Sequence, residues 1–265
     1  MRVESISEQP DEPPRHSLYL LYHELRPRGS EYSYIYDNEQ FDKHVELFVR
    51  LRRAESCSLR PEVTFDDGHI SNFEYALPVL QARGLTARFF ITVGWTGKKP
   101  GYMGWRELRS LHESGQIIGA HGWSHTFLTH CAEKDMDTEL RGARVMLEDK
   151  LGTSITTMSL PGGRYNRRVL AACGEAGYTH IFTSMPRAEV IPSGFLIGRL
   201  NVRRDTTLEW IQNALQPESC VLSRLERQYR IKAAAKVLLG DWVYERLWAL
   251  VNRKEPDGGE EDQAG

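Results

Sequence analysis

Apolar segments alternate with amphipathic segments along most of the chain, and this alternation restricts the fold more than any other feature. The apolar segments are predicted strands, at residues 17–22, 62–65, 87–92, 117–120, 158–160, 181–183 and 196–200. The amphipathic segments are predicted helices, at residues 38–53, 71–83, 104–114, 134–151, 167–176 and 207–215. Strands that alternate with helices through short connections indicate a parallel sheet. Seven such strands favour closure into a barrel over an open sheet.

Polar side chains follow several of these strands directly. Asp66 and Asp67 come after the second strand, His121 after the fourth, and the segment Pro161–Arg164 after the fifth. In a parallel barrel the functional groups collect at the carboxyl ends of the strands. We therefore expect these residues to lie together at one end of the barrel.

The chemistry of these residues indicates a metal site. Neighbouring Asp66 and Asp67 point to opposite sides of their strand end and can therefore have different roles. His121 and His125 share one face if their segment turns helically. One carboxylate and two imidazoles leave coordination positions open, which is typical of a catalytic metal site. The second carboxylate is then a candidate general base for water.

The alternative interpretation is structural. An Asp pair after a strand can be a polar turn that caps a helix, and the two histidines can be hydrogen-bonded loop residues. The combination of both motifs favours the metal site.

Length and composition agree with a globular enzyme. The chain has 265 residues, enough for one domain of barrel size, with 40% hydrophobic and 26% charged residues. The formal net charge of −2 gives no support for nucleic-acid binding, which usually needs a basic surface. The four cysteines, which include no CxxC pair, are predicted to be reduced thiols: Cys57, Cys131, Cys173 and Cys220.

The ends of the chain differ from the middle. Residues 1–15 and 253–265 are predicted to be disordered, and no segment of the chain has the character of a signal peptide. A cytoplasmic location is the expectation. Residues 217–252 are predicted to form a helical extension, broken near Gly240, that either packs on the barrel wall or contacts a membrane surface through its basic residues.

Several motifs also carry a family resemblance. The segments 64–68 (TFDDG) and 121–125 (HGWSH) resemble the first two motifs of the polysaccharide deacetylases, carbohydrate esterase family 4, which share the NodB-homology domain. The segments 21–23 (LYH), 115–119 (GQIIG) and 177–178 (GY) are similar to that family too. The resemblance implies a distorted (β/α)7 barrel domain over residues 16–216, followed by the helical extension.

The resemblance also implies an activity and a set of roles. Members remove acetyl groups from N-acetylated sugars with one divalent metal. Asp67, His121 and His125 would be the metal ligands, and Asp66 the catalytic base. Zinc suits two imidazoles and a carboxylate; cobalt, nickel, manganese and iron are alternatives.

The chain departs from the family pattern in two places. The third motif lacks its usual arginine, which orients the catalytic Asp; Arg164 and Arg199 are the candidates to replace it. The fifth motif lacks its histidine, the usual general acid, so that His23, His69, solvent or Asp66 must protonate the leaving amine. Further residues expected to line the site are Pro161, Gly162 and Tyr165.

The leading hypothesis is thus a metal-dependent deacetylase that acts on an N-acetylated amino sugar, either a polymer or a nucleotide- or lipid-linked precursor. A deformylase or an O-acetyl esterase would use the same site. A catalytically silent carbohydrate-binding relative that retains the metal is the alternative from another class. The sequence leaves the sugar, the metal and the oligomeric state open.

Overall fold

The main sheet has the predicted strands in nearly their predicted positions. The computed structural model describes residues 16–54, 59–190, 194–216 and 219–239. The sheet has the order β10-β8-β7-β6-β5-β4-β1-β11, and these neighbours along the path pair in parallel. Its strands are β1 (His16–Tyr22), β4 (Leu59–Phe65), β5 (Ala87–Ile91), β6 (Ile117–Ala120), β7 (Thr157–Ser159), β8 (His180–Phe182), β10 (Leu196–Ile197) and β11 (Arg199–Asn201).

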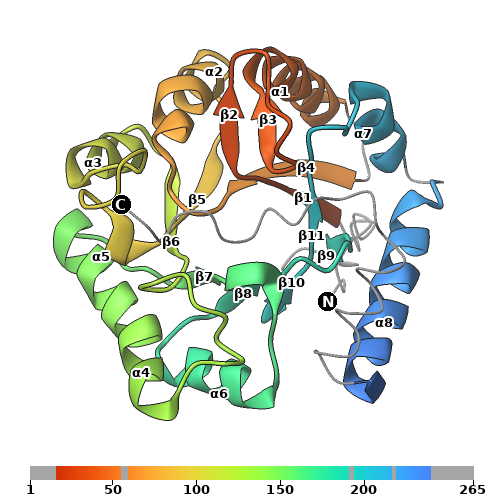
Figure 1. Cartoon of the computed structure of the whole chain (residues 1–265). Helices are drawn as coiled ribbons and strands as arrows, with labels where there is room; N and C mark the ends of the chain where they lie inside the picture. The colour runs from red at the N-terminus through yellow and green to blue at the C-terminus, as the bar shows by residue number, and fades with distance from the viewer. Residues whose placement is uncertain (1–15, 55–58, 191–193, 217–218, 240–265) are drawn as a thin grey trace, which may run out of the picture.

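The strand predicted at 196–200 closes the barrel. Its first part, β10, pairs with β8, and its second part, β11, pairs with β1, on the other side of the ring. Gly198 lies between the two parts, and a Cβ there would lie 2.6 Å from the carbonyl oxygen of Met185. A residue without a side chain is therefore needed where the strand changes partners. Figure 1 shows the resulting ring of strands with the helices around it.

The helices cover the outside of the ring (Figure 1). They are α1 (Asn38–Arg53), α2 (Leu77–Ala82), α3 (Trp105–Glu113), α4 (Glu133–Asp137), α5 (Ala143–Leu151), α6 (Arg167–Glu175), α7 (Leu208–Ala214) and α8 (Val221–Leu239). Helix α1 begins as predicted, where the Asp37 side chain accepts a hydrogen bond from the backbone N–H of Gln40. The predicted helices 71–83 and 134–151 each contain a π-helical turn, at Asn72–Ala76 and Thr138–Gly142.

The interior of the barrel is apolar in the middle and polar at one end. Four side chains from four different strands form a small apolar cluster: Tyr19, Phe90, Phe182 and Ile197. Arg199 lies on this cluster, with its guanidinium carbon 5.5 Å from the centre of the Phe90 ring and 5.8 Å from that of Phe182. The aromatic rings thus form a floor under the polar groups at the strands' carboxyl ends.

Some elements were not expected from the sequence. The short strands β2 (Glu24–Arg26) and β3 (Ile35–Asp37) pair with each other, and β9 (Glu189–Val190) pairs antiparallel with β1. Helix α8 agrees with the predicted extension as far as residue 239, whereas the proposed break at Gly240 and both chain ends lie outside the described residues.

Two other expectations concern the same described ranges. Within them, no helix is long and apolar enough to cross a membrane. Cys131 and Cys173 are buried free thiols and Cys220 is an exposed one, while Cys57 lies outside the description. The cytoplasmic location stays a prediction.

Candidate metal centre and active site

Asp67, His121 and His125 converge at the carboxyl ends of β4 and β6. Their ligand atoms all lie within 4.8 Å of one another. The Nε2 atoms of His121 and His125 are each 3.3 Å from Asp67 Oδ1. One carboxylate and two imidazoles with open positions are a donor set suited to zinc or a similar divalent metal.

The backbone achieves this convergence through two left-handed residues. Asp67 has φ 72° and His125 has φ 67°, a region that residues other than glycine seldom adopt. The segment that joins His121 to His125 is an irregular loop and not a helical turn, so the two histidines do not share a helix face. His125 reaches the site because the left-handed bend turns the loop back toward Asp67. Such backbone outliers are concentrated at functional sites.

The hydrogen bonds of the group fit a metal. His121 Nδ1 lies 2.8 Å from the carbonyl oxygen of Ser159, and because a carbonyl only accepts, Nδ1 carries the proton. The Nε2 lone pair of His121 then points toward Asp67, whose buried Oδ1 has no hydrogen-bond partner. Two acceptor atoms that face each other are unfavourable unless a cation lies between them or a proton is added. A second ring nitrogen fixed by a backbone carbonyl is typical of histidine ligands.

The charges of the group support one another. Burial would raise the pKa of the Asp67 carboxyl, but its interactions with His121 and His125 outweigh burial and hold that pKa well below its usual value. Burial would lower the pKa of His121, but Asp66 and Asp67 outweigh it and raise that pKa. The site therefore favours an ionised Asp67 carboxylate beside positive charge, which either protonated imidazoles or a metal bound to neutral imidazoles can supply.

Glu139 holds the histidine loop in place. The residue is buried, with 6% of its surface exposed. Its Oε2 accepts hydrogen bonds from the backbone N–H groups of Trp123 (2.9 Å) and Ser124 (3.1 Å), and its Oε1 accepts from the Ser124 hydroxyl (2.5 Å). Sequence reasoning missed this residue, because a Glu in a helical segment has the pattern of an ordinary exposed side chain.

Asp66 turns into the barrel, away from Asp67, and is paired with Arg199. Arg199 Nη1 donates to Asp66 Oδ1 (2.7 Å) and Nη2 donates to Oδ2 (2.9 Å). The Ser159 hydroxyl accepts from Arg199 Nη2 (2.7 Å) and donates to Asp66 Oδ2 (2.9 Å). Arg199 Nε donates to the carbonyl oxygen of Thr183, which fixes the plane of the guanidinium.

Asp66 lies beside the metal group and stays ionised. Its Oδ2 is 3.9 Å from His121 Nε2. Burial would raise the pKa of the Asp66 carboxyl, but Arg199 and then His121 outweigh burial and lower it. A bidentate pair between two fully buried groups needs such complete pairing to be stable. Of the two arginines considered from the sequence, Arg199 is thus the one that contacts Asp66.

His23 lies within electrostatic reach of Asp66, Asp67 and His121. It follows β1, and its carbonyl oxygen accepts a hydrogen bond from Asn72 Nδ2 at 2.7 Å. The ring packs edge-on against Tyr34, with 4.8 Å between centroids, and its buried Nδ1 has no hydrogen-bond partner. Burial lowers the pKa of His23, while Asp67 and Asp66 are near enough to oppose that effect. A buried nitrogen without a partner is a rare feature that suggests a functional role.

His69 is less available than His23. Its Nδ1 is 2.9 Å from the Ser71 hydroxyl, and its Nε2 is 3.8 Å from Glu24. Both ring nitrogens therefore face protein groups.

The candidates after β7 divide between the site and its surroundings. Pro161 is buried and lies against Gly122 of the histidine loop. Gly162 has φ 62° and packs on the Phe127 ring, which also receives the Arg164 guanidinium at 4.5 Å. Tyr165 packs on the apolar core. Of the two candidates for the missing third-motif arginine, Arg199 pairs with Asp66, and the Arg164 guanidinium lies over Phe127.

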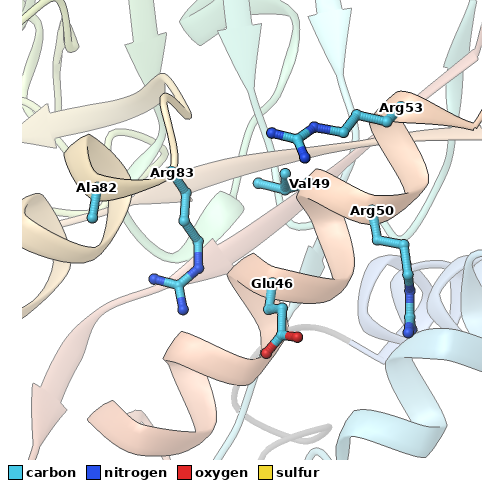
Figure 2. Close-up of a pocket in the computed structure, with 6 residues that line it drawn as sticks. All are labelled: Glu46, Val49, Arg50, Arg53, Ala82 and Arg83. Atoms are coloured by element: carbon cyan, nitrogen blue, oxygen red, sulfur yellow. The ribbon is translucent and has the colours of Figure 1, made fainter.

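An open groove elsewhere on the surface does not belong to this site. It has a volume of about 520 Å³ and lies between α1 and α2, on the outside of the barrel (Figure 2). Figure 2 shows its lining residues, which include none of the metal group: Glu46, Val49, Arg50, Arg53, Ala82 and Arg83. The groove therefore contributes no residue to the group of Asp67, His121 and His125.

Fold and site together define a (β/α) barrel with a carboxylate and two imidazoles arranged to hold a metal. Comparison with known families then names the class more closely. Residues 61–181 match the family model described as polysaccharide deacetylase. The family resemblance expected from the sequence motifs is thereby confirmed.

Curated relatives agree. The chain is 28% identical over 135 residues to "Putative polysaccharide deacetylase YxkH" of Bacillus subtilis (strain 168), covering 51% of this chain and 47% of that protein. It is 26% identical over 119 residues to chitin deacetylase 1 of Cryptococcus neoformans var. grubii, covering 45% of this chain and 24% of that protein. The match thus spans about half of YxkH and less of the fungal enzyme.

Solved structures confirm the predicted (β/α)7-type fold. Streptococcus pyogenes deacetylase PplD, solved in complex with acetate, superposes with a TM-score of 0.67 at 17% identity, covering 77% of this chain and 100% of that chain. IcaB from Ammonifex degensii superposes with a TM-score of 0.63 at 22% identity, covering 76% of this chain and 96% of that chain.

Proposed function

We propose that the protein hydrolyses the acetamide group of an N-acetylated amino sugar with the help of one divalent metal, zinc first among the candidates. The observation that carries this proposal is the position of Asp66. A fully buried, ionised carboxylate lies 3.9 Å from His121 Nε2, beside a group that can hold a metal. Metal binding alone does not require this second carboxylate, whereas hydrolysis requires a base next to the water.

The proposed reaction uses the residues in distinct roles. Asp67, His121 and His125 would hold the metal, which when bound supplies activation of water and polarisation of the amide carbonyl. Asp66 accepts a proton from the attacking water while the water oxygen forms a bond to the carbon of the amide carbonyl. The carbon–nitrogen bond then breaks, so that acetate and a free amine leave.

Asp66 has an acceptor position left for this proton. A carboxylate offers about four acceptor positions, and donors from Arg199 and Ser159 occupy three of them. The ion pair with Arg199 keeps Asp66 ionised and fixes the orientation of its carboxylate. We therefore expect Asp66 to act as a base because it is well positioned for proton transfer, and not because its pKa is high.

We assign protonation of the leaving amine to His23. It lies within reach of the charges of Asp66 and Asp67, and its buried Nδ1 has no protein partner. Both ring nitrogens of His69, in contrast, already face Ser71 and Glu24. His23 would thus take the place of the histidine that the fifth motif lacks.

The decisive experiment is turnover after metal exchange. The purified protein is stripped with a chelator, zinc or cobalt is added back, and acetate release from N-acetylated sugar oligomers is measured. We expect metal-dependent release that falls by about 10²–10⁴-fold in Asp66→Asn and by a similar range in His23→Gln, the usual contribution of acid–base groups. His112→Gln, in the last turn of α3, is the matched control.

Other outcomes separate the alternatives. Release of formate or of O-linked acetate in preference to N-linked acetate would identify a deformylase or an esterase that uses the same site. Sugar binding without any turnover under any metal would favour the catalytically silent binding protein instead.

A further inference from the structure

One side of the site carries a stack of a cation, an aromatic ring and an imidazole. Lys99 Nζ lies 3.9 Å from the centre of the Trp95 ring and 4.8 Å from that of Tyr102. The Trp95 ring in turn lies 5.1 Å from the ring of His125, one of the three residues of the metal group. The exposed ammonium of Lys99 is thus linked to the metal group through one aromatic side chain.

A second chain of contacts, again from a cation through an aromatic ring to an imidazole, begins at a different loop. The guanidinium carbon of Arg203, just after β11, lies 5.7 Å from the centre of the Tyr34 ring. The Tyr34 ring lies 4.8 Å from the ring of His23, the proposed proton donor. Lys99 follows β5 and Arg203 follows β11, so two separate βα loops each place one cation on an aromatic ring that contacts a histidine of the site.

Several basic residues in the described part of the chain are paired with carboxylates. Arg26 pairs with Glu24, Arg83 with Asp42 and Arg168 with Glu133. In the part of the chain that the structure describes, neither Lys99 nor Arg203 has a carboxylate within ion-pair distance. A nearby carboxylate, Glu24, is already engaged by Arg26 and His69.

Packing alone does not account for this arrangement. An exposed cation–π contact contributes about 0.5–1 kcal/mol and needs no ligand. The contribution of such a contact does not explain why both cations lie on aromatic rings that contact histidines of the site. Cations placed around a pocket raise the local concentration of anionic ligands and the rate at which they associate.

We propose that the natural substrate is an amino sugar that carries an anionic substituent, a phosphate or a carboxylate, bound between Lys99 and Arg203. This inference rests on the proposed deacetylase function and specifies its substrate class. The aromatic rings of Trp95 and Tyr34 would flank the sugar while the anionic group faces the two cations. A flexible ammonium and a planar guanidinium suit phosphate and carboxylate oxygens alike.

The test compares a neutral and an anionic substrate of the same sugar. Acetate release from N-acetylglucosamine and from N-acetylglucosamine 1-phosphate is measured at low and high salt, with N-acetylmuramic acid as the carboxylate arm. We expect kcat/KM to favour an anionic sugar by about tenfold or more at low salt, with the advantage shrinking as salt screens the charges. The anionic sugar with the larger gain in kcat/KM over the neutral sugar shows whether the site prefers a phosphate or a carboxylate.

Charge-neutral variants locate the effect. In the double variant Lys99→Gln/Arg203→Gln the ratio of anionic to neutral kcat/KM should approach one, mainly through KM, whereas Lys98→Gln, on the same loop, should keep the ratio of the native protein. Equal efficiency for neutral and anionic sugars in the native protein, or an unchanged ratio in the double variant, would overturn the proposal.

A binding measurement separates this inference from the proposed activity. If no substrate releases acetate, the deacetylase function fails, and calorimetry with glucosamine 1-phosphate and glucosamine still measures the preference for the anion. A preference that disappears in the double variant supports an anionic ligand site. Equal affinity for the two sugars contradicts it.

Discussion

Arg199 and Asp66 lie 133 positions apart in the chain and meet inside the barrel through two parallel hydrogen bonds of 2.7 and 2.9 Å. The family resemblance places an orienting arginine ahead of the third-motif proline, Pro161, where this chain has Ser159 and Leu160. Here β11, the strand that closes the ring beside β1, supplies it. In this chain the guanidinium at Asp66 therefore comes from β11 and not from the third motif.

This pair predicts a shift in the pH dependence of activity. Arg199→Met leaves Asp66 buried without its cation, so the pKa of Asp66 should rise, because burial then acts without the main opposing charge. Because Asp66 must be ionised to act as the base, the enzyme should then lose activity first on the acid side of its pH profile. We expect the acid limb of the kcat profile to move to higher pH, with a loss of about 3–5 kcal/mol in stability.

Two further variants make this prediction specific. Arg199→Lys retains the charge but not the two parallel bonds, and should give an intermediate shift in a protein that still folds. Arg204→Met, an exposed neighbour whose guanidinium bonds the carbonyl oxygen of Glu31, should leave the profile in place. An acid limb that does not move in Arg199→Lys or Arg199→Met would show that the pair does not set the ionisation of Asp66.

Glu139 predicts the effect of the histidine loop on metal affinity. Glu139→Ala removes the acceptor for the backbone N–H groups of Trp123 and Ser124, so the bend that places His125 loses its support. We expect metal affinity, measured by competition with a chromogenic chelator, to fall about 10–100-fold, as for other residues that orient ligands.

The conservative variant provides the counter-test. Glu139→Gln can keep its carbonyl oxygen on both N–H groups and should restore most of the affinity. Glu148→Ala, which also removes an acceptor for a backbone N–H, that of Ile155, is the control away from the site. If Ala and Gln at position 139 bind metal equally, the loop does not depend on these hydrogen bonds.

Two glycines predict opposite changes in stability. A Cβ on Gly119 in β6 would lie 2.6 Å from both the Phe90 ring and the Thr157 hydroxyl, inside the barrel. Gly119→Ala should therefore destabilise the protein by about 1–3 kcal/mol through overpacking. Gly174 in α6 has open space around it, so Gly174→Ala should stabilise the helix by about 0.5 kcal/mol. Urea unfolding of both variants measures the difference, and equal effects would contradict the packing described.

The sequence predicts the parts of the fold that depend on local patterns. Six of the seven strands and all of the helices listed from periodicity occur within a few residues of their expected limits, because burial of one face shows directly in the residue order. The break at Gly198 and the strand β9 were missed, since both depend on which neighbour a strand pairs with. Pairing across the closure of a barrel leaves no local pattern.

The residues of the candidate site also fall into two groups, those that a local sequence pattern predicts and those that depend on contacts between distant parts of the chain. Asp66, Asp67, His121 and His125 stand out because several reactive side chains follow strand ends. Ser159 and Glu139 do not, because each acts through a hydrogen bond to a residue far away in the chain. The choice between Arg164 and Arg199 needed the three-dimensional arrangement for the same reason.

His44 predicts how stability depends on pH. The buried imidazole lies between two tyrosine hydroxyls, 2.9 Å from that of Tyr22 and 3.1 Å from that of Tyr36. The Tyr36 hydroxyl donates to the carbonyl oxygen of Thr206, so it accepts from His44 Nε2–H, and Tyr22 donates to Nδ1. The neutral ring is thus fully paired, and burial lowers the pKa of His44 to about 4 from an ordinary value of 6.5.

The sign of the effect follows from proton binding. Between about pH 4 and pH 6.5 the unfolded chain binds a proton at His44 that the folded protein does not, so stability is complete above pH 6.5 and falls as pH decreases toward 4. The loss should reach about 3 kcal/mol. Urea unfolding at pH 7 and pH 4.5 measures it, and His44→Gln, which cannot titrate, should show a smaller difference than the native protein. An equal difference in both proteins would mean that His44 is not the group that makes the fold sensitive to acid.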